Sequence, residues 1–158
     1  MVKKIVSGGQ TGVDRAALDF AIERSIPHGG WVPKGRKAED GVVPARYQVT
    51  EMATTSYPKR TRRNVLDSDG TVIITHGKAR GGSALTIRAA DECGRPRLHI
   101  ELNTTDIDEA ARGLRTWVRE NDIVVLNIAG PRASEEPGIY EAAKEVLKKA
   151  LNSGAQKV

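Results

Sequence analysis

Short apolar runs alternate with amphipathic stretches along the whole chain. The apolar runs predict strands at Val2–Ser7, Pro27–Val32, Gly70–Thr75, Arg97–Leu102 and Ile123–Ile128. Apolar residues that recur with a period of 3.6 predict helices at Val13–Ser25, Lys59–Asp67, Ala84–Glu92, from Thr105 or Asp106 to Val118, and at Pro137–Leu151. Strands that alternate with helices form parallel sheets. We therefore expect one α/β domain over residues 1–158, with a doubly wound parallel sheet as the middle of three layers.

The parts between these elements are less regular. Residues 33–49 hold prolines, glycines and several charges, and predict a long loop of the kind that is often functional or mobile. Residues 50–57 have no clear pattern, and the tail 152–158 is expected to fray. The first helix carries apolar residues on more than one side, including Leu18 and Ile22, which predicts a partner subunit against it.

Glycine-rich loops follow three of the predicted strands. We call residues 8–15 the first loop, residues 76–83 the second loop and residues 129–134 the third loop. A strand, a glycine turn and a helix N-terminus together present backbone N–H groups and a positive dipole end to an anion. Because the carboxyl ends of parallel strands meet at one edge of a doubly wound sheet, we expect the three loops to form one composite anion site.

The candidate ligand-binding residues come from these loops and from the charged stretch after the second strand. The first loop contributes Gly8, Gly9, Gln10, Thr11, Gly12, Asp14 and Arg15. The end of the strand at 70–75 and the second loop contribute Thr75, His76, Lys78, Arg80, Gly81, Gly82 and Ser83. Ser83 is also expected to be the N-cap of the next helix. The third loop contributes Gly130, Pro131, Arg132 and Ser134, and the long loop contributes Lys34 and Arg36.

Four first-loop side chains have alternative roles. Asp14 can complement the dipole of the helix that it begins, or it can contact the ligand beside the phosphate. Arg15 can bind an oxyanion through its guanidinium fork, or it can pair with Asp19 one turn later. Gln10 and Thr11 can bind the ligand or merely close the turn.

Charge and composition narrow the ligand class. The net charge is +5, which fits either a solvated basic surface or an anionic partner, and the clustering of cations near the predicted rim favours an anionic small molecule. Aromatic residues make up 4% of the chain, too few for a base-stacking face, so nucleic-acid binding is not expected despite the basic run at residues 59–63. No apolar run is long enough to span a membrane, and the N-terminus does not resemble a signal peptide.

The cysteine and histidine content argues against a metal site. The single cysteine, Cys93, allows no internal disulfide and fits a reducing cytoplasm. The three histidines are not at metal-ligand spacing, and we expect no protein metal ligands and no catalytic constellation.

Two common phosphate-binding motifs do not fit. The first loop lacks the Gly-x-Gly-x-x-Gly order, and the second strand ends at Val32-Pro33-Lys34 without a carboxylate for a ribose hydroxyl. The second loop has Ser83-Ala84 where a Walker A loop needs Lys followed by Ser or Thr. A nicotinamide oxidoreductase and a P-loop NTPase are therefore not expected.

Several segments, in one order from residue 5 to about residue 147, resemble the molybdenum cofactor carrier proteins. The segments are Ser7–Asp19, Gly30–Gly41, Arg62–Thr71, Gly81–Thr86 and Asn127–Ser134. The resemblance implies a Rossmann-like fold related to the lysine-decarboxylase-like, or LOG, proteins. It also implies a cytoplasmic homo-oligomer, a dimer or a tetramer, that holds the molybdenum cofactor and hands it to molybdoenzymes.

The resemblance leaves an enzyme open as the alternative. LOG phosphoribohydrolases carry a Pro-Gly-Gly-x-Gly-Thr-x-x-Glu segment with a catalytic glutamate. The corresponding stretch here, residues 80–88, keeps the glycines but has Arg88 nearby and no glutamate. We therefore expect a carrier of molybdopterin. The alternative is a protein that binds a phosphate or nucleotide ligand, or a LOG-like hydrolase that acts on a nucleotide.

Overall fold

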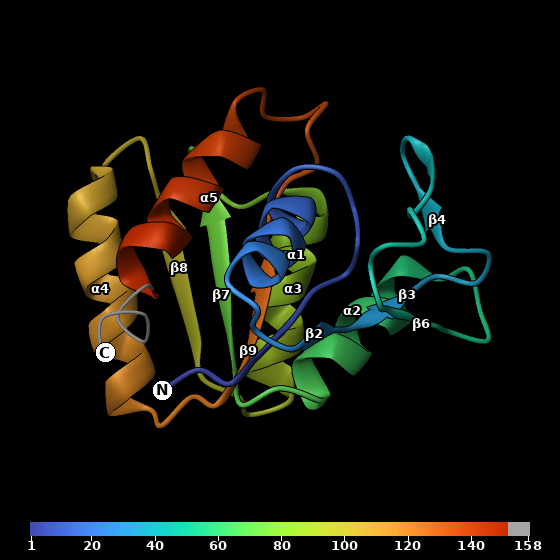
Figure 1. Ribbon diagram of the computed structural model, residues 1–158, viewed down its shortest axis with the longest axis horizontal. Coiled ribbons are helices and arrows are strands. Elements are labelled where there is room, and N and C mark those ends of the chain that lie inside the picture. The colour runs from blue at the N-terminus through green and yellow to red at the C-terminus, as the bar shows by residue number, and fades with distance from the viewer. Residues whose placement is uncertain (152–158) are drawn as a thin grey trace.

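A fully parallel five-stranded sheet forms the centre of residues 1–151, the part of the chain that the computed structural model describes. Its strands are β1 (Lys4–Val6), β2 (His28–Gly29), β7 (Gly70–Thr75), β8 (Arg97–Glu101) and β9 (Val125–Ala129). The spatial order is β2-β1-β9-β7-β8 (Figure 1). The predicted parallel sheet is confirmed, whereas the predicted fraying of 152–158 lies outside the described residues.

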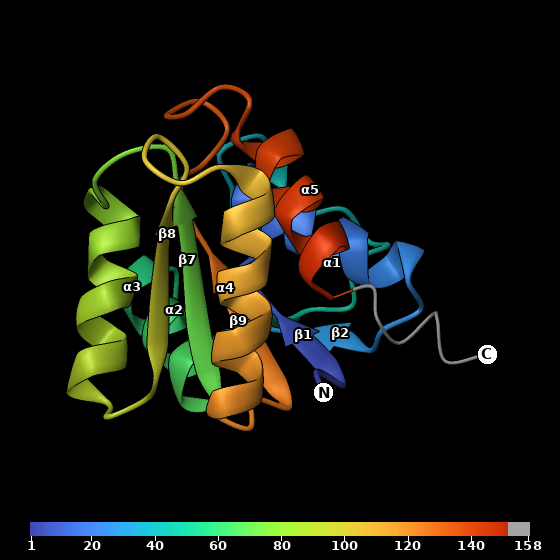
Figure 2. The ribbon, with the colours of Figure 1, turned by 90° about the vertical axis from the view of Figure 1, so that its left-hand side faces the viewer.

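Helices cover both faces of the sheet and complete the three predicted layers. One face carries α1 (Val13–Glu23), α4 (Ile107–Glu120) and α5 (Ile139–Ala150). The other face carries α2 (Tyr57–Leu66) and α3 (Gly81–Glu92). Figure 2 shows the sheet edge-on between these two helical layers. The fold is the Rossmann-like α/β class that the sequence predicts.

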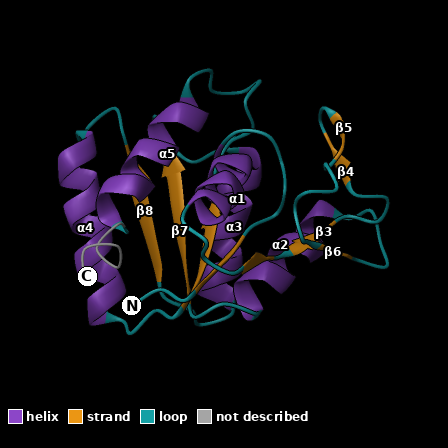
Figure 3. Cartoon of the chain, viewed as in Figure 1, coloured by secondary structure: helices purple, strands orange, loops and turns teal. Residues whose placement is uncertain are grey.

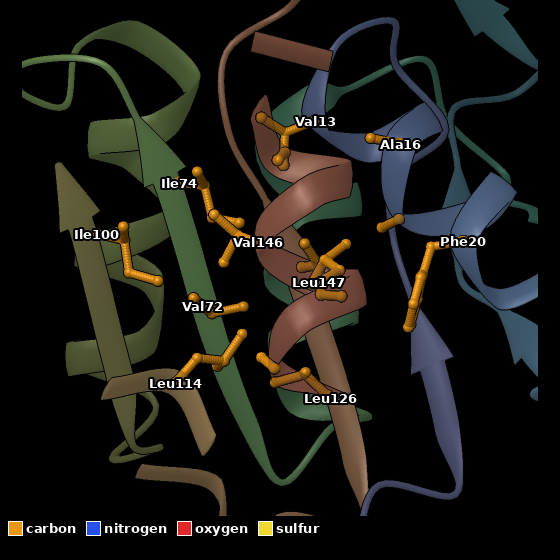
Figure 4. Close-up of a cluster of buried hydrophobic side chains, with 14 of the residues drawn as sticks. Val13, Ala16, Phe20, Val72, Ile74, Ile100, Leu114, Leu126, Val146 and Leu147 are labelled. Atoms are coloured by element: carbon orange, nitrogen blue, oxygen red, sulfur yellow. The ribbon is translucent and has the colours of Figure 1, made fainter. Parts of the chain in front are cut away.

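The main core lies between the sheet and the layer of α1, α4 and α5. Val72 and Leu126 of the strands, Leu114 of α4, Leu147 of α5 and Phe20 of α1 meet there (Figure 4). All six residues of β7 are buried, as expected for a central parallel strand covered on both faces. This continuous burial explains why β7 is the clearest strand in the sequence.

The last strand of the chain, β9, lies inside the sheet between β1 and β7. Counting the strands from β9 onward gives the spatial order 3-2-1-4-5, which is the order of a doubly wound dinucleotide-binding sheet. The chain thus has the strand arrangement of that fold with a different starting point.

The sequence prediction is only partly right between residues 27 and 49, where β2 joins the main sheet as predicted. The single strand predicted at 27–32 is divided at Gly30, whose φ of +130° turns the chain, and a Cβ there would lie 2.0 Å from the Ser7 carbonyl oxygen. The second half becomes β3 (Trp31–Val32), which leaves the main sheet and pairs with β6 (Thr50–Glu51). Two-residue strands are too short to show a periodicity.

The predicted loop at 33–49 contains a small hairpin, and we call residues 33–49 the hairpin segment. Its strands are β4 (Lys37–Ala38) and β5 (Gly41–Val42), and it stands apart from the main sheet (Figure 3). Val43 and Tyr47 of this segment bury Leu18 of α1 in a second apolar cluster. The chain itself therefore covers the second apolar side of α1 at Leu18, where the sequence predicts a partner subunit. Ile22 stays exposed.

Several helix ends differ from the predictions by a few residues. The helix α3 begins at Gly81 after Arg80, so Ser83 lies in its first turn and is not the N-cap. The helix α2 begins at Tyr57, because the Ser56 hydroxyl accepts a hydrogen bond from the Lys59 N–H group. The predicted cap of α4 is confirmed at Asp106, whose carboxylate accepts from Glu109 N–H.

Gly12 and Gly113 give a matched test of the packing between the first and third loops. Gly12 has a φ of +83°, and a Cβ there would lie 2.3 Å from the Pro131 carbonyl oxygen. We predict that Gly12→Ala lowers the free energy of unfolding by about 3 kcal/mol or more, since strain and a backbone clash add. Gly113→Ala, in α4 with open space around it, should instead raise stability by about 0.5–1 kcal/mol. Urea unfolding of both variants measures this, and an equal effect would contradict the close packing at Gly12.

Candidate functional site

The strand order places an opening at the carboxyl ends of β9 and β7. After β7 the chain passes to α3 on one face of the sheet, and after β9 it passes to α5 on the other face. The two loops therefore diverge, which is the topological switch point where doubly wound sheets bind ligands. A pocket lies there.

This pocket has a volume of about 220 Å³ and a mixed polar and apolar lining. The first loop, α2, α3 and the third loop all contribute to its wall. The lining residues are Gln10, Asp14, Tyr57, Arg60, Thr61, Gly82, Ser83, Leu85, Thr86, Ala129, Gly130, Pro131, Arg132 and Glu135. Behind it lies a hollow of about 20 Å³ that shares Asp14 and Arg60 with the pocket wall.

The N-terminus of α3 opens onto this pocket without a side-chain cap. Arg80 is the N-cap residue, and its side chain makes no capping hydrogen bond. The first N–H groups of a helix, here those of Gly81 and Gly82, have no partner within the helix. The Ser83 hydroxyl is buried at the pocket wall and has no hydrogen-bond partner among residues 1–151. An anion in the pocket would receive hydrogen bonds and a favourable dipole from this end.

Arg60 of α2 brings a buried cation to the same wall. Its side chain is 12% exposed, and one terminal nitrogen, Nη1, lies 3.5 Å from a carboxylate oxygen of Asp14. Its Nε atom is buried without a partner in the described part of the chain. A Cβ at Gly8 would lie 1.3 Å from Nη1, so the guanidinium occupies the space that any side chain at Gly8 would need. We call Gly82 N–H, Ser83 Oγ and Arg60 Nε the pocket donors.

Asp14 is the carboxylate of the site. Its carboxylate accepts from the Gln10 N–H group at 3.2 Å and faces Arg60. Burial raises the pKa of Asp14 above its ordinary value, and the Arg60 charge opposes that rise. The structure thus places Asp14 at the start of α1 and also on the pocket wall, so both roles predicted for it remain compatible with its position.

Several hydrogen-bond donors of the first loop are engaged by protein acceptors in the first and third loops. The Thr11 N–H group donates to the Gln10 side-chain oxygen at 3.1 Å, and the Val13 N–H group donates to Pro131 O at 3.3 Å. Gly9 and Gly12 are required by the turn, since both have positive φ. Gln10 and Asp14 line the pocket, whereas Gly8 lines the hollow behind it. Ligand contact stays a prediction for every first-loop residue, including Gln10 and Asp14.

Arg15 is engaged by the hairpin segment. Its Nε donates to the Gly9 carbonyl, and its two terminal nitrogens donate to Asp40 at 2.9 and 3.0 Å. This pair replaces the alternative Arg15–Asp19 pairing that the sequence suggests. Asp19 instead accepts hydrogen bonds from Tyr47 and Tyr140.

Glu39, beside Asp40, joins the hairpin segment to the first and third loops. Its carboxylate accepts from the Thr11 hydroxyl and from the Ser134 hydroxyl and N–H group. These hydrogen bonds hold the pKa of Glu39 below its ordinary value. We call the contacts of Glu39 and Asp40 with Thr11, Arg15 and Ser134 the latch. Ser134 is therefore part of the latch and lies outside the pocket lining.

The remaining predicted residues lie around the rim. Arg36 donates to the carbonyls of residues 43, 44 and 47 and so shapes the hairpin segment, while Lys34 is exposed. Thr75 lies within hydrogen-bond distance of His99, and the His76 N–H group donates to Glu136. Lys78, Arg80 and Gly81 are exposed on the second loop outside the pocket lining. From the third loop, Gly130, Pro131 and Arg132 do line the pocket.

Sequence reasoning missed the contribution of α2 to the site. Tyr57, Arg60, Thr61 and Asn64 line the pocket or the hollow behind it. Their spacing of i, i+3, i+4 and i+7 puts them on one helix face, and this polar stripe was the available signal. The sequence instead grouped Arg60 with its neighbours as a basic surface patch.

Neither a metal centre nor a membrane segment is found in the described residues. No group of three or more His, Cys, Asp or Glu residues within 1–151 is arranged to hold a metal ion. None of the helices described there has the length and apolar character needed to cross a bilayer.

Comparisons with known proteins agree with this architecture. Residues 5–151 match the model of the circularly permutated YpsA SLOG family, and the strand order counted from β9 fits a circular permutation. The chain is 57% identical to a protein from Syntrophus aciditrophicus SB whose 1.45 Å crystal structure bears the name "Putative molybdenum carrier protein". That alignment covers 95% of each chain with a TM-score of 0.94. None of the curated proteins compared matches the chain.

The latch predicts a measurable dependence on Asp40. Asp40→Asn removes the charge that pairs with Arg15, and we expect it to lower the free energy of unfolding by about 1 kcal/mol. This value is discounted for screening by water, because the Asp40 side chain is 46% exposed although that of Arg15 is only 10% exposed. Backbone amides of 33–49 should exchange hydrogen faster. Asp91→Asn breaks a similar two-bond pair with the more exposed Arg97 and should cost about 0–0.5 kcal/mol.

The pH dependence of this contribution has a definite sign. Hydrogen bonds from Arg15 hold the folded-state pKa of Asp40 below its ordinary value of 3.8. The stabilisation is therefore present above pH 3.8 and is lost as the pH falls through the lower folded-state pKa.

An Asp40→Asn variant whose backbone amides in 33–49 exchange hydrogen at the unchanged rate would show that the latch does not hold the hairpin segment.

Proposed function

This chain belongs to the circularly permutated YpsA SLOG family, and we propose that it binds the molybdenum cofactor, with the phosphate end of the cofactor in the pocket at the N-terminus of α3. The observation that carries this proposal is that the residues of all three pocket donors line one pocket at the topological switch point. A buried polar group without a partner costs about 1–3 kcal/mol of stability. An anion that supplied the missing acceptor would recover that free energy on binding.

The charge around the pocket suits a phosphate monoester. Arg60 and Arg132 contribute two cations to the wall, and α3 directs the positive end of its dipole there. Arg132 is also paired at 3.6 Å with Glu135, so it provides a partly neutralised charge at the rim. Arg60, which is much less exposed than Arg132, is the stronger electrostatic anchor because screening by water is weaker there.

The size of the pocket indicates that it holds one end of the ligand. Pockets that enclose a whole drug-sized ligand measure about 300–1,000 Å³, and this one measures about 220 Å³. Tyr57 adds an aromatic side chain to the pocket lining, near which a planar group such as a pterin would lie. The rest of the cofactor would extend over the rim, toward the second loop and the hairpin segment.

The name of the similar protein supports the choice of ligand. The Syntrophus protein is named as a molybdenum carrier, and its 57% identity over 95% of each chain makes a shared ligand class the simplest expectation. Transfer to a molybdoenzyme and assembly into a dimer or tetramer belong to the same proposal.

An enzyme acting on a nucleotide is the alternative, and Asp14 is the observation that favours it. This buried carboxyl group lines the pocket, and a raised pKa is typical of general acids. Against it, α3 contributes no carboxylate to the pocket lining. We expect incubation with AMP to release no adenine. Adenine release that Asp14→Asn abolishes would favour the hydrolase.

Gly82 provides the sharpest test of the carrier proposal. Gly82 lies in the first turn of α3, where an added side chain meets nothing within 4 Å. Gly82→Asp places a carboxylate beside the pocket donors, and an acidic residue in the first turn is compatible with helix stability. We predict at least a tenfold loss of pterin that copurifies anaerobically from a host that makes the cofactor, measured by fluorescence after oxidation.

The matched control is Gly113→Asp in α4. Gly113 is exposed, also has open space around it, and lies on the opposite helical layer from α3. This variant should carry as much pterin as the natural sequence. Equal pterin in both variants would remove the α3 N-terminus from the site, and a natural sequence without any pterin would overturn the choice of ligand. Gly9 is unsuitable for this test, because a Cβ there would lie 2.8 Å from Val32 in a strained backbone.

A further inference from the structure

The Asp14–Arg60 pair is a buried ion pair with loose geometry. Asp14 is 4% exposed as a residue, and the Arg60 side chain is 12% exposed. Their closest nitrogen-to-oxygen distance is 3.5 Å, which is beyond the usual 2.7–2.9 Å of a charge-assisted hydrogen bond. A desolvated carboxylate needs close partners to remain charged. At 3.5 Å, the attraction of Arg60 only partly offsets the desolvation cost of a charged Asp14.

Few other charges act on Asp14. Arg15, next in the chain, is turned toward Gly9 and Asp40. The third loop and the segment after it contribute Arg132 and Glu135, which pair with each other. The lining residues of α3 are uncharged, namely Gly82, Ser83, Leu85 and Thr86. The protonation of Asp14 is therefore governed by burial, by Arg60, by hydrogen bonds from the Gln10 N–H group and the Ser7 side chain, and by whatever anion enters the pocket.

A dianion at the pocket donors changes this balance in one direction. It competes with Asp14 for the guanidinium of Arg60, and it places a second negative charge beside a buried carboxylate. Two adjacent anions in a site of low dielectric favour protonation of one of them. A protonated Asp14 could in turn donate its O–H to an oxygen of the bound anion.

We propose that the pocket takes up one proton, on Asp14, together with the phosphate group of its ligand, so that the ligand binds more tightly as the pH falls. This inference rests on the proposed phosphate site and adds a regulatory property to it. The protein would hold its cargo in acidic conditions and release it more readily in alkaline conditions. Asp14 acts here through Arg60 as well as through its own contact with the anion.

The sign of the effect follows from linkage. Burial already raises the pKa of Asp14 in the ligand-free protein above its ordinary value of 3.8. A bound dianion raises this pKa further, so proton uptake occurs between the free-state and bound-state pKa values. Affinity increases about tenfold per pH unit of decrease inside that interval and is constant outside it, because one proton is linked to one anion.

Sulfate is a suitable probe, because it remains a dianion where a phosphate ester titrates near pH 6. Backbone amide shifts of Gly82 and Ser83 in nitrogen-15 NMR report sulfate binding between pH 5 and pH 8.5. We expect the affinity of the natural sequence to fall at least fivefold across this range. The sulfate affinity of Asp14→Asn should change less than twofold across the same pH range. Asp91→Asn, which is remote from the pocket, should show the same pH dependence of affinity as the natural sequence.

The outcomes separate this inference from the proposed function. A pH-independent affinity of the natural sequence, or the same pH dependence in Asp14→Asn, would overturn the proton uptake while leaving the phosphate site intact. Absence of any sulfate-induced shift at Gly82 and Ser83 would overturn the site itself. Carbon-13 NMR of the Asp14 carboxyl in the natural sequence needs no variant, and its titration midpoint should rise with saturating sulfate. An unchanged midpoint would also refute the inference.

Discussion

The insertion of β9 between β1 and β7 is the constraint on which the rest of the structure depends. It brings the third loop against the first, so closely that Gly130 and Gly12 leave no room for side chains. The Pro131 carbonyl then accepts from the Val13 N–H group at the start of α1. The Pro131 carbonyl thus satisfies one N–H group of α1, while the N-terminus of α3 opens onto the pocket without a side-chain cap.

Electrostatics at the pocket follow from this arrangement. Arg60 reaches across Gly8 from α2, and Asp14 faces it from α1, so opposite charges from two helical layers meet at the carboxyl edge of the sheet. Their pairing is loose at 3.5 Å, and this leaves part of the guanidinium for a ligand. The latch of Glu39 and Asp40 meanwhile fixes the first and third loops. A site whose loops are held by such contacts and whose charge is incompletely paired is suited to holding an anion.

The sequence predicts the main sheet well and the candidate site only in part. The strand β7 can be recognised in the sequence because all its residues are buried and apolar residues dominate it. Asp106 can be recognised as a helix cap because caps have strong residue preferences. The division at Gly30 depends on a close approach to Ser7, a contact between distant elements that no local pattern contains. The engagement of Arg15 by Asp40 is of the same kind. Arg60 lies in the basic run at residues 59–63, and the sequence does not show that it is the basic residue of this run that lines the pocket.

The central claim is that the pocket at the N-terminus of α3, rather than the first loop, holds the anionic end of the ligand. Anomalous diffraction from crystals soaked in tungstate, a tetrahedral dianion of high electron count, locates such an anion directly. The account predicts the strongest tungsten peak at the α3 N-terminus next to Arg60, with tungstate oxygens within hydrogen-bond distance of Gly82 N–H and Ser83 Oγ. A strongest peak on the backbone of residues 8–12, with none at the α3 N-terminus, would contradict it.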